Sequence, residues 1–344
     1  MATKDLKAVI SKNYNYVFNR KTGFFARWGK TKEDDPDYSP IGIEIADIEI
    51  STVCSGIGSG PCRWCYKSNT SRGENMSYEV FVKLFHKLPK TLTQIAFGIG
   101  DLSANPDLFK ILSYCRSNDY NYVVPNITIN GYNLTNEYAD QLVKLCGAIA
   151  VSRYTPKDVC YDAVNKLTNK GLEQTNIHML ISEDTYEDCF EVMKDSKTDP
   201  RLKKLNAIVF LTLKPKGKRN TLKGIKSLDK YKKVIDYALE NDVRIGFDSC
   251  SAPLFMAAIK DTKHSKLSQL CEPCESYLFS MYINVKGQTV PCSFLEGEGF
   301  KEIDVLSIND FTKDIWYNKN VIEFRKKLLN NDRKCFVFDL YGDL

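Results

Sequence analysis

Seven of the twelve cysteines form two groups whose spacing suits metal or iron-sulfur chemistry. The first group is Cys54, Cys62 and Cys65, which follows directly after an apolar run. Three thiolates on one loop can each bind one iron of a 4Fe-4S cluster and leave the fourth iron open to a substrate or cofactor. A structural zinc ion takes four protein ligands and would need a distant fourth one. The first group therefore favours an iron-sulfur cluster, with zinc as the alternative.

The second group consists of Cys250, Cys271, Cys274 and Cys292. Two residues separate Cys271 from Cys274, and four residues separate Gly287 from Cys292. Four thiolates that include a CxxC pair can hold either structural zinc or a further iron-sulfur cluster. Both alternatives stay open for this group.

The remaining composition supports metal chemistry in a reducing compartment. The three histidines are His86, His178 and His264, and none is near a cysteine group in sequence, so mixed Cys/His zinc sites are poorly supported. The N-terminus has no signal-peptide core, and no apolar run approaches the about eighteen residues of a membrane span. We therefore expect a cytoplasmic protein without a membrane partner, in which the cysteines are reduced.

The charge is nearly balanced over the whole chain but not locally. The 344 residues carry 48 basic and 43 acidic side chains, a net charge of +5. Between Arg201 and Lys233, however, twelve Lys or Arg residues face the single acid Asp229. Such a run is usually a solvated surface, and the alternative is that it binds a phosphate-bearing or acidic substrate.

Apolar periodicity predicts an alternation of strands and helices from residue 41 to residue 248. The first strand covers Ile41 to Ser51 and ends just before Cys54. About six β/α units follow one another, which predicts a parallel sheet wrapped by helices, either a partial barrel or a doubly wound sheet. In both architectures the chemistry lies at the carboxyl ends of the strands, where Cys54 is expected.

The segments on either side of this alternation have a different character. Tyr14 to Trp28 reads as an N-terminal β-hairpin that turns at Asn19 to Gly23. After Phe247, a second hairpin is expected between Tyr282 and Val290, and a helix near Asn320 to Leu329. We therefore predict three domains: an N-terminal extension (1–40), an α/β domain (41–248) and a C-terminal domain (249–344).

The cysteine loop resembles that of the radical S-adenosylmethionine (radical SAM) enzymes. Their usual pattern is C-x3-C-x2-C with an aromatic residue before the third cysteine; here Trp64 keeps that aromatic, while the glycine-rich run Gly56 to Pro61 lengthens the first gap to seven residues. The resemblance covers roughly residues 41 to 248 and implies a partial (β/α)6 TIM-type barrel. It also implies that Cys54, Cys62 and Cys65 hold a 4Fe-4S cluster.

The same resemblance suggests which residues bind the SAM cofactor. The glycine-rich motif after the second strand, which receives the methionyl amine of SAM in the family, corresponds to Gly98 to Asp101 here. Polar contacts to SAM are expected at the ends of the third and fourth strands. The implied cofactor-binding residues are Tyr66, Gly98, Ile99, Gly100, Asp101, Asn130, Ser152 and Arg153.

The second cysteine group resembles the auxiliary-cluster extensions of the same family. A full SPASM domain binds two clusters and carries a later run of cysteines, whereas this chain has only Cys335 after Cys292. The shorter twitch version, with one auxiliary 4Fe-4S cluster, is the better match. The resemblance implies Cys271, Cys274 and Cys292 as ligands, with Cys250 in the fourth position, Cys335 as a substitute, or an open site.

The resemblance implies an enzyme that cleaves SAM reductively to a 5′-deoxyadenosyl radical, which then abstracts hydrogen from a substrate C–H bond. A reductant such as flavodoxin or ferredoxin is then an expected partner. The expected substrate is a peptide or protein, and the alternative is a nucleotide, sugar phosphate or nucleic acid that meets the basic run. An alternative of a different kind is a binding protein that is stabilised by structural zinc and has no catalytic activity.

Overall fold

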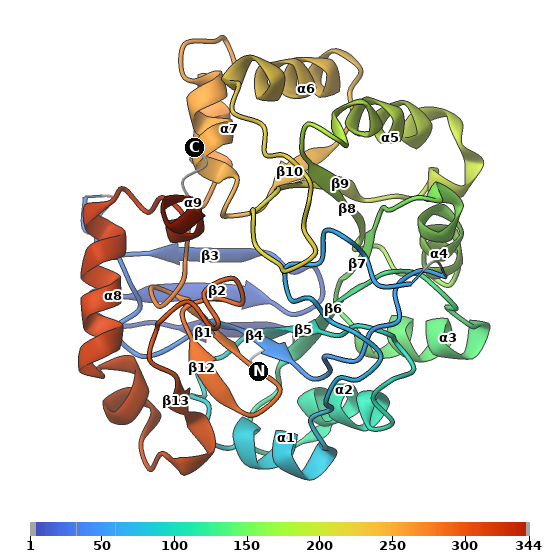
Figure 1. Ribbon diagram of the computed structural model, residues 1–344. Helices are drawn as coiled ribbons and strands as arrows, with labels where there is room; N and C mark the ends of the chain where they lie inside the picture. The colour runs from blue at the N-terminus through green and yellow to red at the C-terminus, as the bar shows by residue number, and fades with distance from the viewer. Residues whose placement is uncertain (1–4, 32, 59, 342–344) are drawn as a thin grey trace.

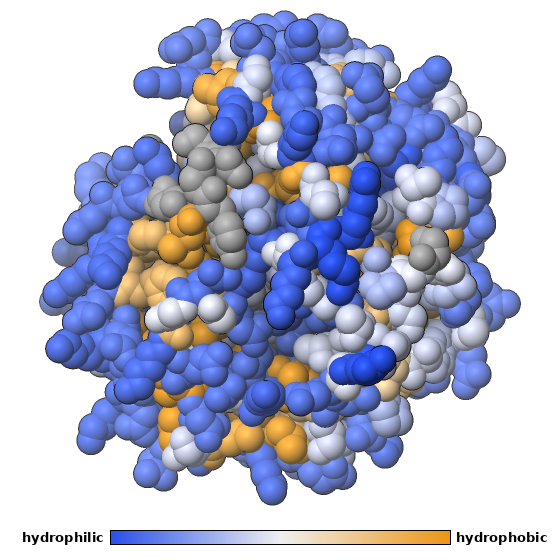
Figure 2. Space-filling view, in the orientation of Figure 1, coloured by the Kyte–Doolittle hydropathy of each residue, from blue (hydrophilic) through white to orange (hydrophobic). Residues whose placement is uncertain are grey.

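The computed structural model describes residues 5–31, 33–58 and 60–341. The outer ends of the predicted first and last domains, and Ser59 in the glycine-rich insertion, lie outside the described residues. Figure 1 shows a large sheet with helices along one side, and a smaller sheet near the C-terminal part of the chain. Figure 2, in the same orientation, shows a mostly hydrophilic surface with separate apolar patches. None of the described helices is long and apolar enough to cross a membrane.

The N-terminal part forms a three-stranded antiparallel sheet of β1 (Leu6–Val9), β2 (Asn15–Asn19) and β3 (Phe25–Trp28). The predicted hairpin is confirmed as β2 and β3. Its turn uses the Asn19 side chain, which accepts hydrogen bonds from two backbone N–H groups, and Gly23 at φ +76°. The sequence analysis did not predict β1, which pairs with β2.

The predicted partial barrel is confirmed as a run of parallel strands from β4 to β10, in which each strand pairs with the next along the chain. The strands are β4 (Ile45–Glu49), β5 (Gln94–Gly98), β6 (Val124–Ile129), β7 (Ile149–Ser152), β8 (Thr175–Ile181), β9 (Ala207–Thr212) and β10 (Ile245–Phe247). Among these described strands, β10 and β4 do not pair with each other, so the barrel is open.

Helices connect successive strands and cover the outer face of the barrel (Figure 1). They are α1 (Tyr78–Phe85), α2 (Leu108–Ser117), α3 (Asn136–Leu145), α4 (Lys157–Asn169), α5 (Tyr186–Thr198) and α6 (Leu228–Glu240). Ser77 caps α1 as predicted, because its side chain accepts a hydrogen bond from the Val80 N–H. Thr135 caps α3 in the same way.

The C-terminal segment extends the same sheet on the side of β4. The predicted hairpin is β11 (Ser280–Ile283) with β12 (Gln288–Val290), and β13 (Ile303–Asp304) pairs with β12. β11 pairs in parallel with β4, a contact that the sequence did not reveal. Helices α7 (Ala252–Ile259), α8 (Lys319–Asn330) and α9 (Phe336–Tyr341) complete this part. The domain boundary near residue 248 stays a prediction, since one sheet runs through both parts.

The two sides of β4 differ in a way that positions the site. Ala46 and Ile48 are fully buried and pack into the main core, on the side of the helices. Asp47 and Glu49 point to the opposite side, because successive strand residues alternate. That side is the interior of the barrel, which therefore carries carboxylates on its first strand.

Candidate active site

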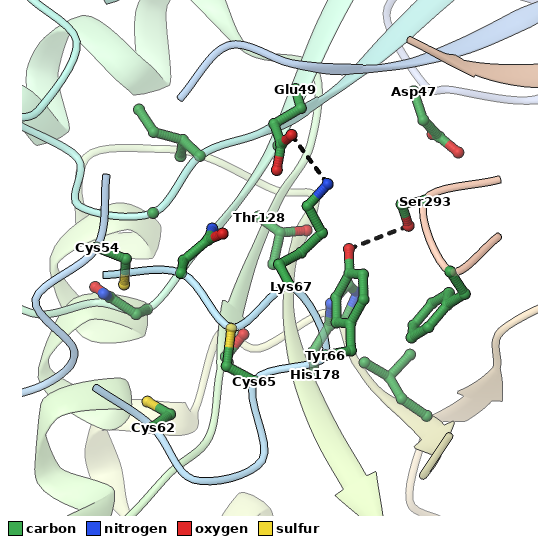
Figure 3. Close-up of a pocket in the computed structure, with 18 of the residues that line it drawn as sticks. Asp47, Glu49, Cys54, Cys62, Cys65, Tyr66, Lys67, Thr128, His178 and Ser293 are labelled. Atoms are coloured by element: carbon green, nitrogen blue, oxygen red, sulfur yellow. Dashed lines mark hydrogen bonds and ion pairs between the residues drawn. The ribbon is translucent and has the colours of Figure 1, made fainter. Parts of the chain in front are cut away.

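A cavity of about 450 Å³ lies at the carboxyl ends of the barrel strands (Figure 3). Its walls come from β4 to β9, from the loop that carries the first cysteine group and from the segment after β12. This volume is in the range of sites for small ligands and cofactors. The cavity lies where the β/α architecture predicts chemistry.

The loop with the first cysteine group is fixed by backbone contacts within the loop and to the segment that follows β5. The Cys54 N–H donates to the Thr70 carbonyl at 2.9 Å, and the Asp101 N–H donates to the Val53 carbonyl at 2.9 Å. A Cβ on Gly100 would stand 2.1 Å from the Val53 oxygen and 2.6 Å from Cys54 Cβ. Only glycine allows this approach, so the predicted glycine motif supports the cysteine loop directly.

Cys54, Cys62 and Cys65 all line the cavity as free thiols. Burial raises the pKa of Cys54 to about 11, and the nearby Asp101, Cys62 and Cys65 act in the same direction. Such a thiol keeps its proton at neutral pH unless a metal displaces it. Three soft ligands on one loop that open into one cavity fit a cluster with one open iron.

Six of the eight predicted cofactor-binding residues line the same cavity: Tyr66, Gly98, Ile99, Gly100, Asn130 and Ser152. The other two face elsewhere. The Asp101 carboxylate accepts the Ser55 N–H at 2.8 Å, which ties it to the cysteine loop. Arg153 is buried against α5, where it pairs with Asp188 at 2.9 Å and with Glu191. A contact of Asp101 or Arg153 with SAM stays a prediction.

A polar wall on the side of β4, which the sequence did not lead us to predict, also lines the cavity. Lys67 Nζ lies 3.0 Å from Glu49 Oε2, donates to the Tyr282 hydroxyl at 2.8 Å and contacts Glu296. The Tyr282 hydroxyl donates to Glu49 at 2.8 Å. Asp47 lies beyond this network (Figure 3). The acids at every second position of an otherwise apolar strand were the signal that could have revealed this wall.

His178 on β8 also lines the cavity. Burial lowers its pKa to about 4, against the opposing effect of Asp248. The imidazole is therefore neutral at physiological pH.

Aromatic and hydroxyl contacts join the cysteine loop to the C-terminal part. The Tyr66 ring stacks on Phe294 with ring centroids 4.0 Å apart, and the Tyr66 hydroxyl donates to Ser293 at 3.1 Å. Because Ser293 follows Cys292, this contact links the two cysteine groups through neighbouring residues.

The structure gathers four cysteines in the C-terminal part: Cys250, Cys274, Cys292 and Cys335. The thiols of Cys250 and Cys335 interact directly, and this interaction, together with burial, raises the pKa of Cys250. Burial raises the pKa of Cys292 to about 12, with Cys250 and Cys274 nearby. Cys271 is half-buried, and its thiol lies 3.8 Å from the Leu267 carbonyl. Burial raises its pKa, and no other cysteine contributes to that shift.

Within the described ranges, no three His, Cys, Asp or Glu side chains converge closely enough to hold a single metal ion. This holds for both cysteine groups.

Within the basic run, the stretch from Lys214 to Arg219 is mostly engaged in contacts within the protein. It is neither a solvated surface nor an open site for phosphate. Lys214 is buried and lies 3.0 Å from Asp248. Lys216 donates to the carbonyls of Phe294 and Glu296, at 2.7 and 2.6 Å. Arg219 donates to the Ser68 and Asn69 carbonyls, at 3.2 and 2.8 Å, and Lys218 is exposed. Arg219 thus holds the cysteine loop in place, and Lys216 holds the segment after Cys292.

Solved structures with the same fold cover most of the chain. SuiB of Streptococcus suis bound to precursor peptide SuiA matches with a TM-score of 0.72 at 13% identity, over 97% of this chain and 95% of that chain. SuiB bound to SAM matches with a TM-score of 0.70 at 13% identity over the same shares. The enzyme anSMEcpe with bound SAM matches with a TM-score of 0.60 at 16% identity, over 86% of this chain and 84% of that chain.

No protein-family model matches the sequence, and no curated protein matches it. SuiB and anSMEcpe are radical SAM enzymes. The predicted resemblance is therefore confirmed at the level of the fold: the chain has the partial-barrel fold of radical SAM enzymes.

Proposed function

We propose that this protein is a radical SAM enzyme that modifies a peptide or protein. The observation that carries the proposal is the cavity, in which three cysteines of one loop and the glycine motif Gly98 to Gly100 meet. The shared fold with SAM-bound SuiB and anSMEcpe supports the same assignment.

The residues of the first site have defined tasks in this proposal. Cys54, Cys62 and Cys65 would hold the cluster, and Gly98 to Gly100 with Asn130 and Ser152 would bind SAM beside it. The cluster, when bound, supplies the electron that cleaves SAM to a 5′-deoxyadenosyl radical. The surrounding walls would orient the substrate C–H bond toward that radical.

In the C-terminal part, we propose that Cys250, Cys274, Cys292 and Cys335 hold one auxiliary 4Fe-4S cluster of twitch type. Cys335 then takes the place that the sequence analysis gave to Cys271. Four protein ligands leave no open iron, which favours an electron-transfer role over direct substrate binding.

A peptide substrate is supported by two of the similar structures, SuiB with precursor peptide SuiA and anSMEcpe with the Cp18Cys peptide. The phosphate alternative loses its main support, because Lys214, Lys216 and Arg219 are engaged within the protein. A flavodoxin or ferredoxin stays the expected electron donor.

Anaerobic reconstitution tests the proposal. The wild-type protein should bind about eight irons in two clusters and release 5′-deoxyadenosine from SAM and dithionite. Cys62→Ala should lose about four irons and the release of deoxyadenosine. Cys115→Ala, a buried cysteine of α2 outside both groups, is the matched control and should retain both.

The zinc alternative predicts a colourless protein that contains zinc and tolerates air. Release of deoxyadenosine that is indifferent to Cys62→Ala would overturn the assignment of the first cluster. For the second cluster, Cys335→Ala should lose about four irons whereas Cys271→Ala should lose none.

A further inference from the structure

The acidic side chains and lysines that line the cavity are paired with one exception. They are Asp47, Glu49, Lys67, Lys214 and Asp248. Glu49 and Lys67 lie 3.0 Å apart, and Lys214 and Asp248 also lie 3.0 Å apart. Among the described residues, Asp47 has no hydrogen bond and no ion pair. The cavity therefore contains one carboxylate without a counterion.

Asp47 points into the cavity from the middle of β4. Its register partners are Ala96 on β5 and Tyr282 on β11, and its chain neighbours Ala46 and Ile48 are fully buried. Ala96 is small, so space stays open beside the carboxylate. Figure 3 shows Asp47 on the opposite side of the cavity from Cys54, Cys62 and Cys65. This side lies away from the proposed cluster and is free to receive a substrate.

The two lysines of the cavity wall, Lys67 and Lys214, are engaged with other partners. Lys67 is held by Glu49, Tyr282 and Glu296 at the same time. Desolvation by the surrounding walls and the negative charge of the nearby Glu275 raise the pKa of Asp47 to about 7, although its side chain is exposed to the cavity. Both effects favour a cation that enters from outside over any internal partner.

The Asp47 side chain is exposed to the cavity, so its carboxylate is open to any ligand that enters, and no group of the described residues occupies it. We infer that Asp47 is a specificity-determining residue that receives a cationic group of the substrate, the ammonium of a lysine or the guanidinium of an arginine side chain. This inference rests on the proposed peptide substrate.

The test measures binding of short peptides to the reconstituted protein loaded with SAM. The probes are acetylated and amidated Ala-X-Ala peptides in which X is lysine, arginine, or their neutral counterparts norleucine and citrulline. Titration calorimetry should give at least about tenfold tighter binding for one charged peptide than for its neutral counterpart. The lysine and arginine pairs separate the two kinds of cation.

Substitution of Asp47 should remove this preference. In Asp47→Asn and Asp47→Ser the ratio of the two affinities should fall close to one, and in Asp47→Lys a peptide with glutamate should bind more tightly than one with glutamine. Asp242→Asn is the matched control, because Asp242 is fully exposed at the end of α6, and it should keep the preference.

Two results would overturn the inference. One is equal or absent binding of charged and neutral peptides by the wild-type protein, and the other is a preference that survives Asp47→Asn and Asp47→Ser. Release of deoxyadenosine by the wild-type protein without any peptide is measured in parallel. Its absence would count against the radical function, independently of the peptide preference.

Discussion

Asp47 and Glu49 stand two positions apart on the same side of β4, yet only Glu49 has a cation beside it. Their environments differ because Lys67 follows the cysteine loop and reaches Glu49, Tyr282 and Glu296. At the scale of single residues, charge pairing therefore separates a structural carboxylate from one that is open to a ligand.

The pH dependence of stability should reflect this difference. Desolvation by the cavity walls and the nearby Glu275 raise the pKa of Asp47 from 3.8 to about 7, although its side chain is exposed to the cavity. An acid with a raised folded pKa is ionised more readily in the unfolded chain, so Asp47 lowers stability progressively as the pH rises from about 4 to about 7. Asp47→Asn removes this cost. At pH 8 it should unfold about 1–2 °C above the wild type, a small gain because the Asp47 side chain is exposed and water screens its charge.

Thermal unfolding of both proteins between pH 4 and pH 8 measures this effect. The difference should shrink toward pH 4, where Asp47 is protonated in both states. Asp242→Asn should show no such trend, since its side chain is fully exposed. A variant that is less stable than the wild type at pH 8 would contradict the prediction.

At the scale of elements, the segment after β9 holds the cysteine loop. Gly217, at φ +110°, brings the backbone so close to the loop that a Cβ would stand 2.4 Å from the Cys65 oxygen. Arg219 then donates to the Ser68 and Asn69 carbonyls. This segment and the cysteine loop are about 150 residues apart in sequence and act as one unit.

Arg219→Ala should therefore loosen the cysteine loop. Hydrogen bonds from a charged donor contribute about 1.5–3 kcal/mol, so we expect a loss of about 2 kcal/mol and faster proteolysis between Cys54 and Thr70. Lys218→Ala, one residue earlier and exposed, should change stability by less than about 0.5 kcal/mol. Denaturant unfolding and limited proteolysis check both variants. Equal effects of the two changes would show that a general loss of charge, rather than the carbonyl contacts, is responsible.

At the scale of the whole molecule, Arg27 joins the three predicted parts of the chain. It extends from β3, pairs with Glu44 before β4 at 2.7 Å, and lies 3.4 Å from both Glu272 and Glu275. Its guanidinium also stacks 3.3 Å from the centre of the Phe279 ring. The buried Glu44 further accepts a hydrogen bond from Tyr14 of the N-terminal part. The N-terminal sheet is therefore packed against the barrel and the C-terminal part together.

Arg27→Met should destabilise the whole chain by about 2 kcal/mol, because it removes the charged donor whose hydrogen bonds Glu44 and Glu275 accept. Arg72→Met, at an exposed position on the cysteine loop, is the matched control and should have little effect. Denaturant unfolding followed by fluorescence and by far-UV circular dichroism gives both values. If the N-terminal sheet unfolded separately while the rest of the chain kept its stability, this coupling would be refuted.

Local patterns in the sequence were sufficient for most of the fold. The isoleucine-rich strand before Cys54, the Ser77 cap and the turn at Asn19 each depend on neighbouring residues, and all three are found in the structure. The spacing of Cys54, Cys62 and Cys65 and the glycine motif led to the correct fold because they recur at fixed places along a β/α chain. Six of the eight residues expected to bind the cofactor line the cavity for the same reason.

What the tertiary structure alone decided depends on contacts between distant segments. The pairing of β11 with β4 brings Tyr282 to Glu49 across more than two hundred positions, and no local pattern encodes such a pairing. Folding places Cys335 beside Cys250, leaves Cys271 apart and turns Arg153 toward α5. Asp47 was visible in the sequence as an acid on an apolar strand. Asp47 lacks an ion pair because Lys67 pairs with Glu49 and Lys214 pairs with Asp248. Only the folded chain determines these pairings.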